Sequence, residues 1–350
     1  MKNLFYLVLL TPFLMASSCE DDDLVISAGE YEDAVFVLNQ GTFGSGSGTV
    51  DAYLPTGDSV VSSAFERVNS RPVGNIVQSM AIVDGRGYIM VNNAAKAEVV
   101  NANTLTSLAT ITDLSQPRYM LPVTSDKGYI SQWGDGFTGA IKVIDLNTNT
   151  VTATLDTRSG AERMVNADGN VFVTHTGGFG RDSVVTVWDA ATDTLINTIV
   201  VGDSPNGIIR AGADNFWVLC GGFFDFTDPT LSTPSSLVRM DLDGNILADI
   251  ELPAQGAGNL AVSPDGTRLY FTLGGNVHAH LTEGSTPFDA TPLITRSFYG
   301  LGVDPATGNI YGADAGDFTS AGRVYIYTDT GVPVSDFEAG IIPGNFAFNR

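Results

Sequence analysis

Five short segments of this chain combine glycine with phenylalanine. They are Gln40–Gly44, Trp133–Phe137, Gly177–Arg181, Gly221–Phe226 and Asp314–Phe318. Glycine allows a backbone to approach a ligand closely, and an aromatic ring offers a flat apolar contact. The combination predicts an aromatic rim for a large, partly apolar ligand that is planar or carries rings. The alternative is that each phenylalanine packs inside the protein and each glycine serves only turn geometry.

The fourth of these segments belongs to the longest predicted loop. It runs from Gly221 to about Pro234 and carries three phenylalanines. A long loop without clear structure of its own is often functional. We therefore expect this loop to contribute to a binding site.

A second set of candidate residues lies at the start of each predicted inner strand. These aligned pairs are mostly polar: Gln78-Ser79, Arg118-Tyr119, Glu162-Arg163, Asn206-Gly207, Gly258-Asn259, Tyr299-Gly300 and Gly344-Asn345. A ligand pocket orients its ligand with a few such groups, whereas a polar, water-filled channel is the alternative. Arg118 and Arg163 stand out because the chain has 17 lysines and arginines against 39 acidic residues.

The candidate ligand-binding residues come from both sets. They are Gln40, Phe43, Arg118, Tyr119, Trp133, Phe137, Arg163, His175, Phe179, Arg181, Asn206, Phe223, Phe224, Asp225, Asn259, Tyr299, Asp317 and Phe318.

Motifs for metal binding and catalysis are poor. His278 and His280 alternate along one strand-like run without a third ligand nearby, so we interpret them as a solvated or edge pair. The run 241–245 looks like the start of a calcium loop, but Leu252 stands where a bidentate glutamate is needed, which favours a turn. No serine-hydrolase elbow, metalloprotease helix motif or phosphate loop occurs. We expect no catalytic set, no metal and no resident cofactor.

The elements that position these residues follow from a sevenfold repeat. An aromatic residue near the start of a β-rich run recurs at intervals of 41 to 53 residues, at Phe36, Tyr88, Tyr129, Phe172, Trp217, Tyr270 and Tyr311. Each repeat holds four strand-like runs, separated by glycine, asparagine, aspartate and proline. A period of this size, built from strands and turns, predicts the blades of a propeller. We predict an all-β, seven-bladed β-propeller over residues 34–350.

The two ends of the repeat array complement each other. The first repeat begins at its second strand, Val35–Leu38, and the chain stops at an inner-strand pattern, Pro343–Phe348. We expect the C-terminal strand to complete the first blade, because that pairing removes the exposed edges of a linear array.

The N-terminus reads as a targeting segment. Lys2 precedes an apolar run that is too short to be left as a membrane span, and small residues follow up to Cys19. The stretch resembles the signal and lipobox of bacterial lipoproteins, which implies removal of residues 1–18 and acylation of Cys19; an ordinary signal peptide is the alternative. An acidic run, 20–23, opens a tether over residues 19–33. We predict that Cys220 is a buried free thiol, since no other cysteine is left to pair with it.

The charge balance argues against polyanionic partners. The formal net charge is -22, so the chain repels nucleic acid phosphates and anionic lipid headgroups. We expect no nucleic-acid binding and contact with the membrane only through the lipid anchor.

The repeat resembles the YVTN and YncE-like propellers. The resemblance rests on a proline-glycine strand entry, a Ser-Pro-Asp-Gly turn and third strands that end in aspartate, here Ser204–Gly207, Ser263–Gly266, Val143–Asp145 and Val187–Asp189. It covers residues 34–350 and is weakest in the first and sixth repeats. It implies the propeller fold and leaves the function open.

A lipidated cysteine, an acidic run and such a ring together resemble surface lipoproteins of the Bacteroidetes that work beside TonB-dependent transporters. The segments Leu38–Gly44, Ser70–Met80, Val91–Asn93 and Pro117–Tyr119 look like the opening of the family that includes the cobalamin-binding surface propellers. The resemblance implies an outer-membrane, surface-exposed protein that captures a ligand, with a corrinoid as the leading cargo, and hands it to the transporter. A lactonase-like hydrolase and an adhesion or scaffold protein are the alternatives.

Overall fold

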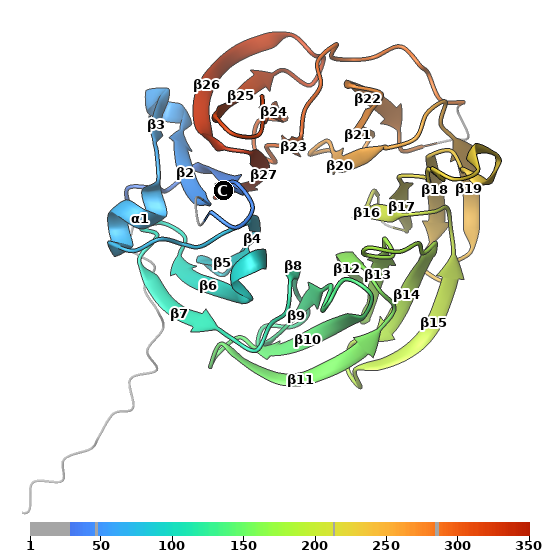
Figure 1. Cartoon of the computed structure of the whole chain (residues 1–350), viewed down its shortest axis with the longest axis horizontal. Helices are drawn as coiled ribbons and strands as arrows, with labels where there is room; N and C mark the ends of the chain where they lie inside the picture. Colours follow the sequence, from blue (N-terminus) through green and yellow to red (C-terminus); the bar gives the residue numbers. More distant parts are fainter. Residues whose placement is uncertain (1–28, 46–47, 213, 284–286) are drawn as a thin grey trace, which may run out of the picture.

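The computed structural model describes residues 29–45, 48–212, 214–283 and 287–350. Its strands form seven antiparallel sheets arranged as blades around a common axis (Figure 1). Blades 1 to 3 consist of β27 (Pro343–Phe348), β1 (Val35–Asn39), β2 (Thr49–Leu54) and β3 (Ser59–Val61); β4 (Val77–Val83), β5 (Arg86–Val91), β6 (Lys96–Asn101) and β7 (Ser107–Ile111); and β8 (Pro117–Pro122), β9 (Lys127–Gln132), β10 (Gly139–Asp145) and β11 (Thr150–Thr157). The all-β, seven-bladed prediction is confirmed.

Blades 4 to 7 complete the ring. They consist of β12 (Ala161–Ala167), β13 (Asn170–His175), β14 (Val184–Asp189) and β15 (Thr194–Val200); β16 (Pro205–Arg210), β17 (Asn215–Cys220), β18 (Ser236–Asp241) and β19 (Ile246–Glu251); β20 (Gly258–Val262), β21 (Arg268–Leu273) and β22 (Asn276–Leu281); and β23 (Gly300–Val303), β24 (Ile310–Asp314), β25 (Ala321–Tyr327) and β26 (Pro333–Ile341). Among the described residues there is one short helix, α1 (Ala64–Asn69), and three 3₁₀ turns.

The ring closes through its C-terminal strand, as predicted. β27 pairs antiparallel with β1, with Val35 opposite Phe348. The two residues after β27 hold the same joint from outside. The Asn349 amide donates to the carbonyl oxygen of Tyr31 at 2.9 Å, and Arg350 forms an ion pair of 2.7 Å with the buried carboxylate of Asp304 in blade 7.

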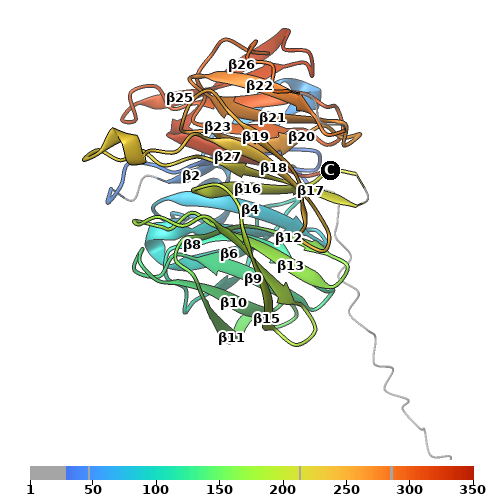
Figure 2. The ribbon, with the colours of Figure 1, turned by 90° about the vertical axis from the view of Figure 1, so that its right-hand side faces the viewer.

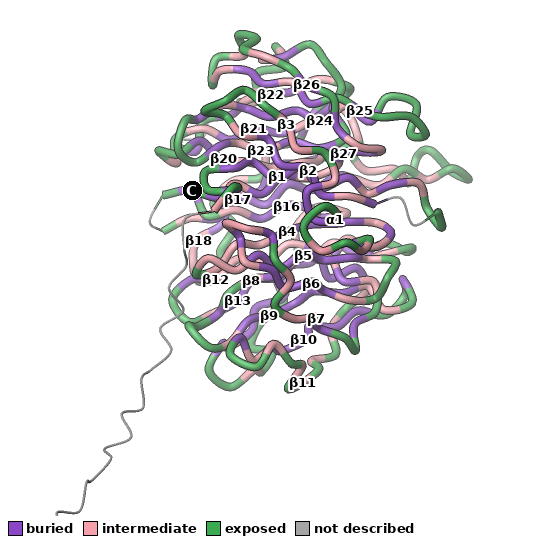
Figure 3. The backbone as a smooth tube through the Cα atoms, turned by 90° about the vertical axis from the view of Figure 1, so that its left-hand side faces the viewer, coloured by how far each residue is buried: buried purple, intermediate pink, exposed green. Residues whose placement is uncertain are grey.

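The seven repeated aromatic residues explain the period of the sequence. Each is at most 2 % exposed, and each belongs to a different hydrophobic cluster, one cluster at each interface between neighbouring blades. A blade therefore buries its aromatic residue only against its neighbour, and stacking of blades builds a continuous core. Figure 3 shows the resulting burial along the strands, with exposed loops on both faces.

The sixth blade differs from the prediction of four strands in every repeat. It ends at β22, and the described part of the chain beyond makes one bridge to it, between Ile294 and Val277. His278 and His280 lie on this edge strand, as the edge interpretation predicts, but they are buried and not solvated. His280 packs against Trp217 of blade 5, with the ring centroids 5.4 Å apart.

Two further predictions are confirmed by the strands of blade 5. Cys220 is a fully buried free thiol, and burial raises its pKa to about 12. The run 241–245 forms the turn between β18 and β19, in which the Asp241 carboxylate accepts hydrogen bonds from the backbone of Asp243 and Asn245.

The chain enters the propeller on one face and presents its long loop on the other. Tyr31 is buried and donates its backbone N–H to Asn103, in the turn between β6 and β7. The loop between β17 and β18, gold in Figure 2, projects from the face opposite to the C-terminus. The signal segment, Cys19 and the acidic run lie outside the described residues. No described helix combines the length and apolarity that a membrane span requires.

Candidate functional site

The aromatic segments lie in loops that join the second and third strands of their blades. Because successive strands run antiparallel, these loops leave all blades on one face, which we call the mouth. Six of their phenylalanines are between 48 % and 89 % exposed: Phe43, Phe137, Phe179, Phe224, Phe226 and Phe318. They do not pack between blades, so the packing alternative is wrong for these six residues.

The exposed rings of the rim contact one another. Phe179 meets Trp133 edge-on, with ring centroids 6.0 Å apart, and meets Phe137 at 5.8 Å. Phe318 meets Tyr299 edge-on at 5.4 Å. Edge-to-face contacts of this kind hold rings in defined orientations while their faces stay open to solvent.

A first cavity of about 370 Å³ opens at the mouth. Six of the predicted residues line it: Gln40, Phe43, Arg118, Tyr119, Asn259 and Tyr299. The Tyr299 hydroxyl donates to the Gln40 side-chain oxygen at 3.0 Å, and the Asn259 amide donates to the Tyr299 carbonyl at 3.1 Å. Groups from opposite ends of the sequence therefore form one polar wall of this cavity.

A second cavity of about 350 Å³ adjoins the first. It is lined by the predicted residues Arg118, Trp133, Arg181, Asn206, Phe223 and Phe224. Arg118 lines both cavities, so the two meet at this residue.

Arg118 is the centre of a partly buried cluster, the wall cluster, formed with Glu162 and Trp133. Both oxygens of the Glu162 carboxylate accept from the guanidinium, at 2.9 and 2.8 Å, and the Trp133 indole N–H donates to the same carboxylate at 2.8 Å. The guanidinium carbon lies 4.3 Å from the Trp133 ring centroid. Burial alone would lower the pKa of Arg118, but the Glu162 carboxylate outweighs it and raises that pKa. The arginine is a fixed cation in the wall of the mouth.

Arg181 forms a second cluster, the rim cluster, with Asp203 and Phe223. Its guanidinium donates to both oxygens of Asp203, at 2.9 and 2.7 Å, and lies 4.4 Å from the Phe223 ring centroid. Thr233, at the far end of the long loop, donates its hydroxyl to Asp203 at 2.7 Å. The bridge between Phe223 and Thr233 closes the base of the loop, and the bond to Asp203 ties it to the connection between blades 4 and 5.

The other predicted residues divide into four groups. Phe137, Phe179 and Phe318 form the rim. Asp225 and Asp317 cap turns within their own loops; Asp225 is half-buried and Asp317 is exposed. Arg163 stacks on Tyr119 at 3.8 Å and lines a smaller cavity of about 110 Å³ between the inner strands. His175 is not at the mouth.

His175 is fully buried inside blade 4. One ring nitrogen lies 2.8 Å from the Thr186 hydroxyl, and the other lies 3.1 Å from the Arg158 carbonyl. Burial lowers its pKa to about 4, so the ring is neutral at pH 7. Its surroundings give it a structural role.

Among the residues that line the mouth, the sequence prediction missed Gln78, Glu162 and Asn345. Gln78 accepts from Arg118 at 2.7 Å, and Glu162 holds the wall cluster together. All three belong to the aligned pairs at the starts of the inner strands, and that alignment could have identified them.

Metal-ligand groups are scarce in the part of the chain that the structure describes. It contains no group of three or more His, Cys, Asp or Glu side chains that could hold a metal ion. The mouth instead offers aromatic faces, amides, hydroxyls and two anchored guanidinium groups, which suit binding of a ligand by stacking and hydrogen bonds.

Comparison with solved structures shows the fold alone, because the identities are low. A quinonprotein alcohol dehydrogenase-like protein from Bacteroides thetaiotaomicron is similar over 91 % of this chain and 79 % of its own, with 14 % identity and a TM-score of 0.69. A functionally unknown protein from Desulfotomaculum acetoxidans matches 90 % of this chain and 98 % of its own, at 10 % identity and a TM-score of 0.66. Hydrazine synthase from Kuenenia stuttgartiensis matches 78 % of this chain and 92 % of its own, at 13 % identity and a TM-score of 0.56.

Sequence comparisons give a family without a known activity. No curated protein matches the chain. Residues 33–338 match the family described as a domain of unknown function, DUF5074, and the chain belongs to that family.

Proposed function

We propose that this protein captures a large, ring-bearing ligand at the mouth of its propeller, with a corrinoid as the leading candidate. The observation that carries the proposal is the rim of six exposed phenylalanines around two adjoining cavities that are lined with polar groups. Exposed apolar surface of this kind on a strongly charged chain marks a binding surface.

A corrinoid matches the chemistry of this mouth in two ways. Its flat macrocycle can stack on the aromatic rim, and its amide arms can exchange hydrogen bonds with Gln40, Asn259 and the Tyr299 hydroxyl. A molecule of this size is larger than either cavity. It would therefore lie across the mouth and insert only its arms.

The proposed location is the outer face of the outer membrane, with a lipid on Cys19. The chain enters the propeller beside Asn103, on the face opposite to the mouth. A lipid at the end of this segment would hold the mouth away from the membrane, where it can meet ligand from the medium and then a TonB-dependent transporter. Loss of fatty-acid labelling and of membrane association in a Cys19→Ser variant tests the anchor, and digestion of intact cells by added protease tests the exposed face.

Titration of the purified protein with cyanocobalamin and cobinamide tests the ligand. We expect saturable 1:1 heats in calorimetry and a shift in the visible spectrum of the bound corrinoid. If neither cyanocobalamin nor cobinamide gives either signal, corrinoids are removed as the cargo. Co-purification of a TonB-dependent transporter with the tagged protein tests the handover, and its absence at saturating ligand would contradict it.

A further inference from the structure

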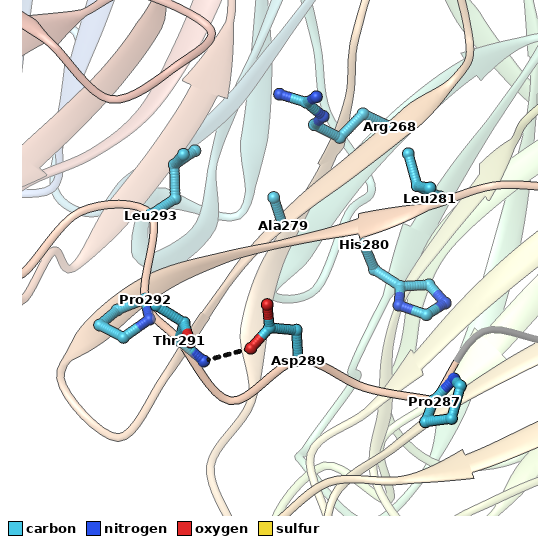
Figure 4. A pocket seen from close by; sticks show the side chains of 9 residues that line it. All are labelled: Arg268, Ala279, His280, Leu281, Pro287, Asp289, Thr291, Pro292 and Leu293. Atoms are coloured by element: carbon cyan, nitrogen blue, oxygen red, sulfur yellow. Dashed lines mark hydrogen bonds between the residues drawn. The ribbon is translucent and has the colours of Figure 1, made fainter.

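Another cavity lies outside the mouth, at the open edge of blade 6. Six blades carry a fourth strand, and blade 6 ends at its third strand, β22. A cavity of about 490 Å³ opens along this edge (Figure 4), with Arg268, Ala279, His280 and Leu281 on the sheet side and the segment from Pro287 to Leu293 on the other.

The chain itself is prevented from completing this blade. Val277 exchanges backbone hydrogen bonds with the segment beyond, donating to Ile294 at 2.9 Å and accepting from Leu293 at 2.8 Å. If this antiparallel register continued, Pro292 would stand opposite Ala279, and proline has no N–H to donate. The segment instead turns away, with the Asp289 carboxylate accepting from the backbone of Thr291 at 2.9 Å.

Among the residues that the structure describes, the edge of β22 beyond Val277 therefore has no partner. Outward-facing residues alternate along a strand, so Ala279 and Leu281 present their N–H and C=O groups on the same side as Val277. No described residue forms a hydrogen bond with these outward groups. Such a row of free groups is a template for another extended chain. The other blades also end on an edge, but β22 lies one strand deeper, at the floor of a cavity.

The charge beside this edge selects the kind of strand that fits. Arg268 stands opposite Leu281 in the β21–β22 pair and lines the same cavity. Its guanidinium donates to the Asp329 carbonyl at 3.4 Å, and no described carboxylate forms an ion pair with it. Seven other arginines do form ion pairs with described residues. A strand with a carboxylate at this point would supply the missing partner.

We propose that the edge of β22 is a docking site for an extended segment of a partner protein. The segment adds as the fourth strand of blade 6, antiparallel to β22, and places an aspartate or glutamate beside Arg268. This site is independent of ligand capture at the mouth.

Binding of blocked octapeptides to the full-length protein tests the proposal. The probes are SVTVEVTS and its counterpart with lysine in place of glutamate. Each peptide carries a fluorescent label, and its binding is measured by fluorescence anisotropy. Leu281→Pro removes one outward N–H without breaking the β21–β22 ladder, and Leu281→Ala is the matched control that keeps it. Arg268→Gln removes the charge. Melting temperatures confirm that each variant is folded.

We expect the glutamate peptide to bind about three- to fivefold more tightly than the lysine peptide, and Arg268→Gln to abolish this preference. Leu281→Pro should weaken both peptides by about fivefold or more, whereas Leu281→Ala should keep at least half of the wild-type affinity. Binding that Leu281→Pro leaves unchanged, or no saturable binding by either peptide, would overturn the proposal.

Discussion

The mouth contains two arginine clusters made of the same parts, and they differ in burial. Each has a guanidinium, a carboxylate that binds it with two hydrogen bonds, and an aromatic ring on which it stacks. The Arg118 and Glu162 side chains of the wall cluster are 17 % and 6 % exposed, and the Arg181 and Asp203 side chains of the rim cluster are 43 % and 11 % exposed. The same combination of arginine, carboxylate and aromatic ring thus occurs once in the wall of the mouth and once at its rim.

The difference follows from the elements that carry each cluster. Arg118 and Glu162 lie at the starts of the inner strands β8 and β12, so the cluster joins blades 3 and 4 near the axis. Arg181 and Asp203 lie in loops, and their pair joins two loops at the mouth. Burial removes solvent screening and makes an unpaired charge costly, so we expect removal of either partner of the wall cluster to destabilise the protein. The rim cluster is free to contact a ligand at little cost to the fold.

Glu162→Gln should show the largest effect on stability. The amide presents N–H groups where Arg118 requires acceptors, and the buried guanidinium loses its counter-charge. We expect a loss of about 3–5 kcal/mol in the free energy of unfolding, measured by urea denaturation at pH 7. A loss below about 0.5 kcal/mol would show that the wall cluster does not hold blades 3 and 4 together.

Acidification should destabilise the protein through His175, which lies buried in blade 4. Its ordinary pKa is 6.5 and burial lowers it to about 4. As the pH falls below 6.5 the unfolded chain takes up a proton and the folded protein does not, so stability is lost between pH 6.5 and about 4. We expect the free energy of unfolding to fall by about 2–3 kcal/mol between pH 7 and pH 4.5 through this group, measured by denaturation at the two pH values.

His175→Asn separates this effect from the titration of His278 and His280. Burial lowers the pKa of these two histidines as well. The variant should lose the share of the change that His175 contributes, about 2–3 kcal/mol, and keep the share of the other two histidines. An unchanged pH dependence would show that His175 is not the group responsible.

Asp203→Asn should show the smallest effect on stability. The Arg181 guanidinium holds the pKa of Asp203 below its usual value of 3.8, so the pair contributes at neutral pH and is lost only as the pH falls through the lowered pKa. At pH 7 the urea midpoint should move much less than in Glu162→Gln. The remaining shift should shrink at about 0.5 M salt, because the partly exposed pair is screened. A shift equal to that of Glu162→Gln would erase the distinction between wall and rim.

The fold could be predicted because its periodic signal comes from burial. Phe36 and the aromatic residues aligned with it each fill one interface between blades, so the period of the sequence is the period of the core. The missing fourth strand of blade 6 could not be predicted from composition. Leu293 to Thr295 reads as a strand, and only the register with β22 shows that Pro292 falls where a donor is needed.

The candidate site was predicted well where it depends on loops and less well where it depends on side-chain direction. His175 ends β13 beside the Gly-Phe loop, yet its side chain points into the blade, and a shift of one residue along a strand exchanges the two faces. Glu162 was aligned with the other strand entries. Its importance comes from a partner 44 residues away, Arg118, and the sequence gives no direct sign of that pairing.

Corrinoid affinity of matched variants tests the central claim, that the mouth is the binding site. Calorimetric titration with cyanocobalamin would compare the wild type with Trp133→Ala, Phe223→Ala and, as a control, Leu195→Ala, an exposed apolar residue of the outer strand β15. The account predicts that each mouth variant weakens binding by about tenfold or more, through lost stacking, while Leu195→Ala binds as the wild type does. Wild-type affinity in both mouth variants, with folding intact, would contradict it.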